Sequence, residues 1–256
     1  GDLWVGTNKG ISVIRDEVVV AGFGHNPGQP GSLSHEEVYC IFEDSKKQMW
    51  IGTYRGLNLF NASDSTFITF DSIPVLINST IYSILEDKEL LWIGTDNAGL
   101  IRFDPANPKN WKIYTKADGL PDNVIYGILK DGEDNLWMSS NNGIFKVIRQ
   151  DDSDKITVVA YNSSNWLNTD AFNIGAYHKD RSGILYFGSF DGVTMFLPEN
   201  VKGNDYIPPV YITAFELFFE PVQISDDGST PLNTSIVETG RIVLSHDQNV
   251  LKFGFT

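Results

Sequence analysis

The stretch LWIGTDNAGLIRFD, residues 91–104, sets the pattern from which the fold can be predicted. An aromatic residue is followed two places on by a glycine, then by a polar turn and a second glycine. Similar stretches begin at Leu3 (LWVGTNKGISVI), Met49 (MWIGTYRGLNLF), Leu136 (LWMSSNNGIFKV) and Leu185 (LYFGSFDGVTMF). The five aromatics lie 46, 42, 45 and 49 residues apart. This period is typical of β-propellers, in which one repeat is one four-stranded blade.

Apolar strands before and after each copy support the same interpretation. A short strand ending in an acid precedes the aromatic strand, as in VYCIFED at 38–44 and IYSILED at 81–87, and forms a hairpin with it. A third strand follows the turn, and a fourth comes after it, such as STFITF at 65–70. These strands are rich in β-branched and aromatic residues and lack helical periodicity. We therefore predict an all-β fold, a partial propeller of about five four-stranded blades whose first and last are incomplete.

The repeated residues have separate structural roles. Trp92 and its counterparts are expected to pack between blades, where a large ring removes much apolar surface from water. Gly94 is expected to mark the close approach of a neighbouring backbone, and Gly99 to end a turn that needs positive φ. The third copy has one extra residue in its turn, Ala98, so we expect this turn to protrude and to carry Asp96 and Asn97 with it.

Composition limits the partners of the chain. Its formal net charge is -14, and it has no cluster of Lys and Arg, so nucleic acid is excluded as a partner and a sulfated ligand is disfavoured. No apolar run reaches the roughly 20 residues needed to cross a bilayer, so we expect no membrane contact by this segment. The single cysteine, Cys40, lies in an apolar strand and is interpreted as a buried, inert thiol.

Metal and cofactor sites are not indicated. The four histidines are scattered over different blades and the last domain without the spacing of a metal site; they are His25, His35, His178 and His246. The acidic runs at 131–135 and 151–154 lack the alternating ligands of a calcium loop. We expect no metal and no cofactor.

The pattern LWIGT, two or three turn residues, then GLIRFDP, together with DGLPDNVIYGIL at 118–129, resembles the two-component regulator propeller repeat. The likeness covers about residues 1 to 200. It implies the sensor region of a Bacteroides-type hybrid two-component histidine kinase, a periplasmic segment of an inner-membrane protein. It further implies an oligosaccharide ligand derived from a glycan, a homodimer, and a kinase that lies outside this chain, so this segment is not expected to be an enzyme.

The last part of the chain has lost the repeat. IPPVYITAFELFFEPVQI at 207–224 and the expected hairpin RIVLSHDQNVLKFGF at 241–255 resemble the start of the immunoglobulin-like Y_Y_Y domain that follows the propeller in the same sensors. We predict propeller blades over 1–205 and the beginning of a β-sandwich over 206–256. Because the sequence opens inside a blade and ends inside this sandwich, we interpret it as a fragment.

Candidate ligand-binding residues follow from the strand order of a blade. The turn between the second and third strands and the crossing to the next blade emerge on the same face, and Asn, Asp, Arg and Tyr there suit sugar hydroxyls and ring faces. The candidates in the turns are Asn8, Lys9, Tyr54, Arg55, Asp96, Asn97, Asn141, Asn142, Phe190 and Asp191. Those in the crossings are His35, Asn78, Asp122, Asn123 and Asp170.

Three alternatives stay open from the residues alone. Asn, Asp and Gly also dominate turns for purely conformational reasons. Acids on the channel face could serve a propeller glycosidase or lyase if Asp96, Asp122, Asp170 and Asp191 converge. The chain could also be a scaffold for other proteins.

Overall fold

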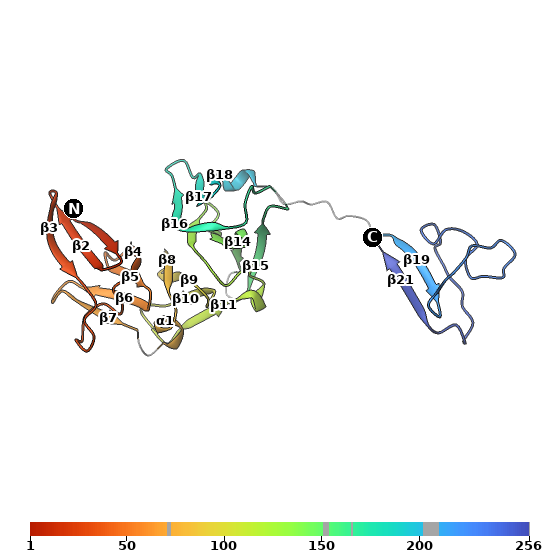
Figure 1. The fold of residues 1–256 in the computed structure, drawn as a ribbon, viewed down its shortest axis with the longest axis horizontal. Coiled ribbons are helices and arrows are strands. Elements are labelled where there is room, and N and C mark those ends of the chain that lie inside the picture. Colours follow the sequence, from red (N-terminus) through yellow and green to blue (C-terminus); the bar gives the residue numbers. More distant parts are fainter. Residues whose placement is uncertain (71–72, 151–153, 165, 202–209, 256) are drawn as a thin grey trace. The chain divides into compact units, whose positions relative to one another are not determined.

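The computed structural model describes residues 1–70, 73–150, 154–164, 166–201 and 210–255. The chain divides into two compact units, Gly1–Val201 and Lys202–Thr256 (Figure 1). The predicted boundary between residues 205 and 206 lies outside the described residues. No helix among the described residues is long and apolar enough to cross a membrane.

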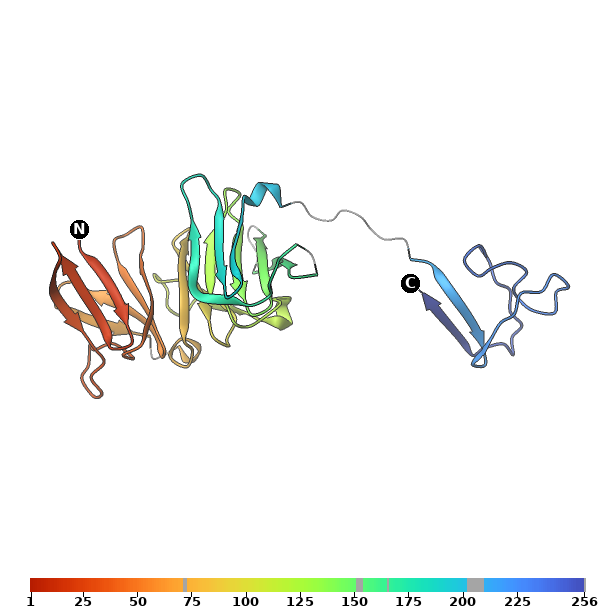
Figure 2. The ribbon, with the colours of Figure 1, turned by 45° about the horizontal axis from the view of Figure 1, so that its top comes forward.

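The first unit is built from five antiparallel sheets (Figures 1 and 2). The first sheet has three strands, β1 (Leu3–Thr7), β2 (Gly10–Arg15) and β3 (Val18–Phe23). Three four-stranded sheets follow: β4 (Val38–Glu43), β5 (Met49–Thr53), β6 (Gly56–Asn61) and β7 (Thr66–Thr69); β8 (Ile81–Asp87), β9 (Leu90–Thr95), β10 (Leu100–Phe103) and β11 (Trp111–Tyr114); β12 (Gly127–Lys130), β13 (Leu136–Ser140), β14 (Gly143–Arg149) and β15 (Ile156–Tyr161). The fifth sheet has β16 (Phe172–Lys179), β17 (Leu185–Ser189) and β18 (Gly192–Phe196).

The sheets follow one another as propeller blades. In each four-stranded sheet the strands lie in chain order, and the first strand is the inner one. The inner strands are neighbours in sequence order, with β4 beside β8, β8 beside β12, and β12 beside β16. The predicted all-β fold of about five blades, of which the first and last are incomplete, is therefore confirmed. Helical segments are short: α1 (Pro74–Ile77), η1 (Lys116–Asp118) and η2 (Pro198–Asn200).

The tryptophans and the first glycines hold the blades together. Trp50, Trp92 and Trp137 are each at most 2% exposed. A Cβ on Gly52 would lie 2.8 Å from the carbonyl oxygen of Ile81 in the next blade, so neighbouring backbones approach as predicted. Ser139 occupies the same position in the fourth blade, where it is buried and its hydroxyl has no hydrogen-bond partner in the part of the chain that the structure describes.

The acid at the end of the inner strand closes the hairpin that follows. Asp44 Oδ2 accepts a hydrogen bond from Trp50 Nε1 at 2.9 Å, and its Oδ1 accepts from the amides of Lys46 and Gln48. The acids at the same position in the fourth and fifth blades bind their hairpins and aromatics in the same way; they are Asp131 with Trp137 and Asp180 with Tyr186. Three of the four repeated acids are therefore structural.

Asp87 is the exception, because the β8–β9 turn is shorter and holds only Lys88 and Glu89. Its carboxylate is 1% exposed and instead pairs with Lys130 and Arg149 of the fourth blade. The third and fourth blades are thus joined by a buried carboxylate that pairs with two cations, while Trp92 Nε1 has no hydrogen-bond partner among the described residues.

The second unit contains a three-stranded sheet in the order β20 (Glu220–Pro221), β19 (Ile212–Leu217), β21 (Leu251–Phe255). The predicted hairpin over 241–255 is wrong, because β21 pairs with β19 and not with the segment just before it. Phe253 stacks on Phe215 with ring centroids 5.1 Å apart, and Lys252 pairs with Glu216. These cross-strand contacts favour the distant partner over the local one.

Candidate ligand-binding face

The turn between the second and third strand is built in the same way in all five blades. The hydroxyl at the end of the second strand donates to the carbonyl oxygen of the glycine that ends the turn, and accepts from an amide inside the turn. The hydroxyls are those of Thr7, Thr53, Thr95, Ser140 and Ser189. At Gly99, φ is +81° and a Cβ would lie 2.1 Å from the Tyr114 carbonyl oxygen. Only glycine fits this position.

The turns and the crossings share one face, as their strand order predicts. The amide of the turn glycine donates to a carbonyl oxygen of the crossing to the next blade in four successive blades. These bonds join Gly10 to Glu36, Gly56 to Ser79, Gly99 to Asn123 and Gly143 to Asp170, at 2.7 to 3.1 Å. This backbone network holds the face rigidly, whatever side chains the turns carry.

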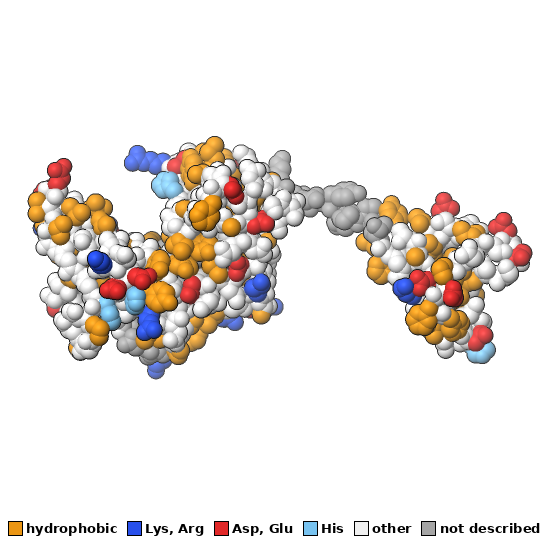
Figure 3. Space-filling model, viewed as in Figure 1, with side chains coloured by type: hydrophobic (Ala, Val, Ile, Leu, Met, Phe, Trp, Pro, Cys, Tyr) orange, Lys and Arg blue, Asp and Glu red, His pale blue; other side chains and the backbone are white. Residues whose placement is uncertain are grey.

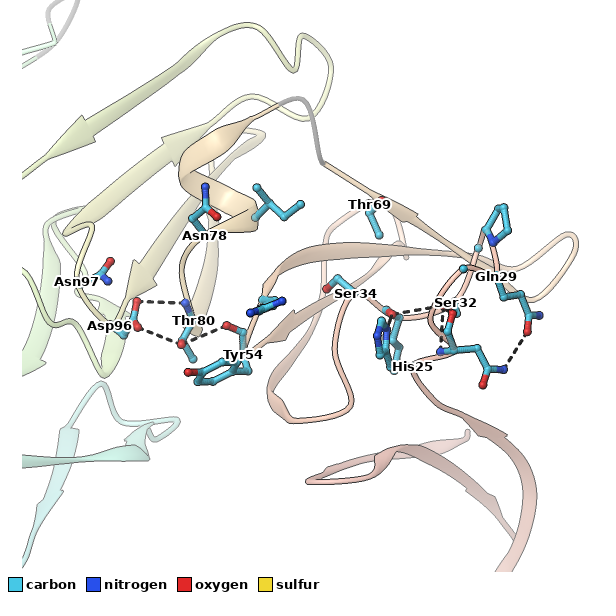
Figure 4. A pocket seen from close by; sticks show the side chains of 17 residues that line it. His25, Gln29, Ser32, Ser34, Tyr54, Thr69, Asn78, Thr80, Asp96 and Asn97 are labelled. Carbon is cyan, nitrogen blue, oxygen red and sulfur yellow. Dashed lines mark hydrogen bonds between the residues drawn. The ribbon is translucent and has the colours of Figure 1, made fainter.

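A cavity of about 940 Å³ opens on this face between the second and third blades (Figure 4). Four predicted turn residues line it, Tyr54 and Arg55 from the second blade and Asp96 and Asn97 from the third, together with Asn78 of the crossing. The loop at 25–34 between the first two blades forms the opposite wall. Strand order therefore located the residues that meet here.

The longer turn of the third blade bends back over the crossing. Asp96 accepts a hydrogen bond from the Thr80 amide at 3.1 Å, and the Thr80 hydroxyl lies 3.1 Å from its second oxygen and 3.3 Å from the Tyr54 carbonyl oxygen. Thr95 accepts from Ala98, one residue farther than its counterparts in the other turns. The extra residue thus leaves Asp96 half-buried, while Asn97 is exposed.

Two histidines that appear unrelated in the sequence meet beside this cavity, and one of them, His25, lines it. The rings of His25 and His35 stack 6.2 Å apart, and His35 lies 5.0 Å from the ring of Tyr54. His25 Nδ1 is 2.6 Å from the carbonyl oxygen of Leu33, which can only accept, so this nitrogen donates. The feature of the sequence that could have indicated this histidine contact is the loop NPGQPGSLSH, which follows His25 and ends at His35. Its glycines with positive φ, Gly28 and Gly31, fold the loop back on itself. No group of metal-ligating side chains was found among the described residues.

The remaining candidates lie on the same face but do not line the cavity, and most have turn contacts. Asp122 accepts from the Val124 amide, and Asn123 from the Lys116 amide. Asn142 donates to the Pro121 carbonyl oxygen. Asn141 accepts from the Tyr126 hydroxyl at 2.8 Å. The fifth turn holds Phe190, which is 90% exposed, and Asp191, whose amide donates to Ser189.

The fold and this face define a β-propeller whose repeats each present one crossing and one turn. Three segments, residues 32–55, 75–97 and 119–142, match the two component regulator propeller family. Each segment begins in a crossing and ends in the turn of the same blade, so the chain carries repeats of this family in its second, third and fourth blades.

The chain is similar to a histidine kinase and to the extracellular domain of a two component system. The chain is 29% identical over 238 residues to histidine kinase P4 of Formosa agariphila, with 88% of this chain and 17% of the relative covered. A solved extracellular domain assigned to the hybrid two component system BT3049 of B. thetaiotaomicron is 28% identical, with a TM-score of 0.72 over 99% of this chain and 33% of that one. The chain therefore spans a minor part of either relative, and the comparison supports a sensor role.

Other propellers share the fold alone. The virginiamycin B lyase of Staphylococcus aureus has a TM-score of 0.53 and 17% identity, with 77% of this chain and 66% of that chain covered. This likeness gives no support to a lyase activity, since one fold carries many functions.

Proposed function

We propose that this chain is part of the extracytoplasmic sensing region of a two-component histidine kinase, and that its turn face binds an oligosaccharide derived from a glycan. The segment belongs, in this proposal, to the periplasmic part of an inner-membrane protein. Its kinase lies elsewhere in the protein. The ligand shifts the balance between two arrangements of a homodimer, as its affinity differs between them.

The observation that carries this proposal is the cavity between the second and third blades. Its volume of about 940 Å³ lies within the range of about 300–1,000 Å³ typical of ligand sites. Its walls combine an exposed aromatic ring, Tyr54, with a guanidinium, amides and a carboxylate, from Arg55, Asn78, Asn97 and Asp96. Such groups bond sugar hydroxyls from several directions, while the ring faces the apolar side of a pyranose.

The glycosidase or lyase alternative has less support. Of the four acids that could converge on the channel, only Asp96 lines this cavity. The carboxylate of Asp170 accepts hydrogen bonds from Ser163, and that of Asp122 caps its own crossing. A paired-carboxylate mechanism needs two acids within about 10 Å on opposite sides of a bond. The scaffold alternative has no specific observation in its favour.

Calorimetric titration of the purified chain with a panel of defined neutral oligosaccharides tests the proposal. We expect saturable binding without turnover, weakened roughly tenfold or more by Tyr54→Ala and by Arg55→Ala. Lys9→Ala is the matched control, because Lys9 holds the position of Arg55 in the first blade but does not line the cavity. Hydrolysis or elimination of a bound sugar would contradict the sensor role, and unchanged affinity in both cavity variants would contradict the site.

A further inference from the structure

The inner strands of the second and third blades each contain a β-bulge at the same place, and the bulged residue is a tyrosine. In β4, Val38 pairs with Thr53 and Cys40 with Gly52, so Tyr39 has no partner in the ladder. In β8, Ile81 pairs with Thr95 and Ser83 with Gly94, which leaves out Tyr82 in the same way.

The fourth blade repeats the arrangement just before its inner strand. Gly127 pairs with Ser139, while the amide of Tyr126 also donates to the Ser139 carbonyl oxygen at 2.9 Å. Two residues again oppose one. A β-bulge re-aims the side chain it carries, and bulges are frequent beside functional sites. Two bulges and this third arrangement therefore place a tyrosine at the same point of three successive blades.

The three rings form a continuous row across the blades. Tyr39 and Tyr82 lie 5.3 Å apart with an interplanar angle of 76°, and Tyr82 and Tyr126 lie 5.5 Å apart at 46°. All three are half-buried, so each keeps part of its surface accessible. Figure 3 shows hydrophobic side chains gathered over β8 on this unit, with acidic side chains beside them.

One side of the row of tyrosines is covered by another residue, and the other side is accessible. Tyr177 of the fifth blade packs on Gly127, where a Cβ would lie 2.4 Å from its ring, so the space beside the residue after Tyr126 is occupied. Burial raises the pKa of the Tyr177 hydroxyl, which remains neutral. The fifth blade therefore covers the row beside Gly127.

Two of the three hydroxyls of the row donate to acceptors of this face. Tyr39 donates to Glu37 Oε2 at 3.0 Å, and Tyr126 donates to Asn141 Oδ1 at 2.8 Å. The carbonyl oxygen of Glu37 accepts from the amide of the cavity residue Tyr54 at 2.9 Å, so the backbone beside Tyr39 adjoins the cavity. Burial and then the charge of Asp96 raise the pKa of Tyr82 to about 12. The ring contacts and hydrogen bonds of the three tyrosines are thus made to aromatic, carboxylate and amide groups.

We propose that Tyr39, Tyr82 and Tyr126 extend the cavity into an elongated site that binds further rings of an uncharged oligosaccharide. Aromatic faces bind the apolar faces of pyranose rings, and Asn141 and Glu37 accept from sugar hydroxyls. The carboxylates of Glu37 beside the row and of Asp96 in the cavity disfavour sulfated or uronic chains. This inference rests on the proposed function, since it assigns the length and charge of the same ligand.

The experiment is a titration of the chain with neutral oligosaccharides of increasing length and with one sulfated chain of the longest size. Tyr126→Leu removes the aromatic face but keeps an apolar side chain for packing, and Tyr126→Phe retains the ring as the matched control. We expect Tyr126→Leu to bind the shortest sugar that wild type binds equally well, and to bind the longest about tenfold more weakly. The Phe variant should stay within about threefold of wild type, and the sulfated chain should not bind.

The outcomes separate the two proposals. If wild type binds no oligosaccharide, both the proposed function and the extended site are overturned. If Tyr54→Ala weakens binding but Tyr126→Leu and Tyr82→Leu leave the dependence on length unchanged, only the extended site is overturned. Tight binding of the sulfated chain would overturn the charge assignment of the row.

Discussion

Gly94 lies so close to Ile125 of the next blade that a Cβ would come within 2.8 Å of the Ile125 carbonyl oxygen and of its Cγ2. The chain just before the inner strand of one blade thus rests on the second strand of the preceding blade, and a backbone atom cannot move aside as a flexible side chain can. This contact repeats at Gly52 against Ile81. It fixes the distance between blades.

We expect Gly94→Ala to lower the free energy of unfolding by about 1–3 kcal/mol, the usual range for overpacking a dense core. Ser139→Ala provides the comparison at the same position of the next blade, where a Cβ is already accommodated and the buried hydroxyl lacks a partner. The free energy of unfolding of Ser139→Ala should equal or exceed that of wild type. Urea denaturation followed by tryptophan fluorescence measures both. Equal stability of Gly94→Ala and wild type would show that the blades can shift.

The blades and the face could be predicted because both depend on periodic features of the sequence. A large aromatic every 42 to 49 residues fixes the number of blades, and strand order then fixes which turns share a face. Tyr54 and Asp96 lie 42 residues apart, yet they line one cavity for this reason.

Features that depend on non-local contacts could not be predicted. The stacking of His25 on His35 requires the path of the loop between them. The bulges at Tyr39 and Tyr82 are defined by pairing register, although a tyrosine repeated in VYC, IYS and IYG was visible in the sequence. The pairing of β21 with β19 was missed because an apolar strand can pair locally or at a distance, and the Phe215–Phe253 contact decides.

Asp87 should contribute stability that depends on pH. Burial alone would raise the pKa of its carboxyl, but hydrogen bonds from Lys130 and Arg149 outweigh burial and hold this pKa below its ordinary value of 3.8. A lowered folded pKa means that the contribution is present above the unfolded value and is lost as pH falls through the folded one.

At neutral pH we expect Asp87→Asn to destabilise the chain by about 3–5 kcal/mol, because two cations lose their buried partner. The difference from wild type should shrink as pH falls below about 4. Asp154→Asn breaks the more exposed pair with Arg102, where Asp154 is 60% exposed, and should change stability by at most about 1 kcal/mol. Denaturation at several pH values measures all three proteins. A difference that does not vary with pH would assign the effect of Asp87→Asn to packing instead of charge.

Asp131 should stabilise the chain through its hairpin and its tryptophan. Its carboxylate accepts from the amides of Glu133 and Asn135 at 2.9 Å and from Trp137 Nε1 at 2.8 Å, and Trp137 is fully buried. Asp131→Ala leaves a buried donor without a partner, so we expect a loss of about 1–3 kcal/mol and a change in tryptophan fluorescence. Glu133→Ala, in the exposed part of the same turn, should have little effect. If both variants lose the same stability, the tryptophan contact contributes nothing.

Ala98 should determine the shape of the cavity. It is the residue by which the third turn exceeds the other four. Its amide donates to Thr95 from three residues farther along the chain, whereas in the other turns the donor lies two residues after the hydroxyl. Deletion of Ala98 restores the shorter turn, which the hydroxyl of Thr95 and the left-handed Gly99 can still close, so we expect nearly unchanged stability. The deletion should break the hydrogen bonds between Asp96 and Thr80 and move Asn97 away from Tyr54. Binding of an oligosaccharide that wild type accepts should then weaken roughly tenfold or more. Thr95→Val leaves buried backbone groups unpaired, so this variant should instead lower the free energy of unfolding by about 1–3 kcal/mol. Full retention of affinity in the folded deletion variant would show that the longer turn has no part in the site.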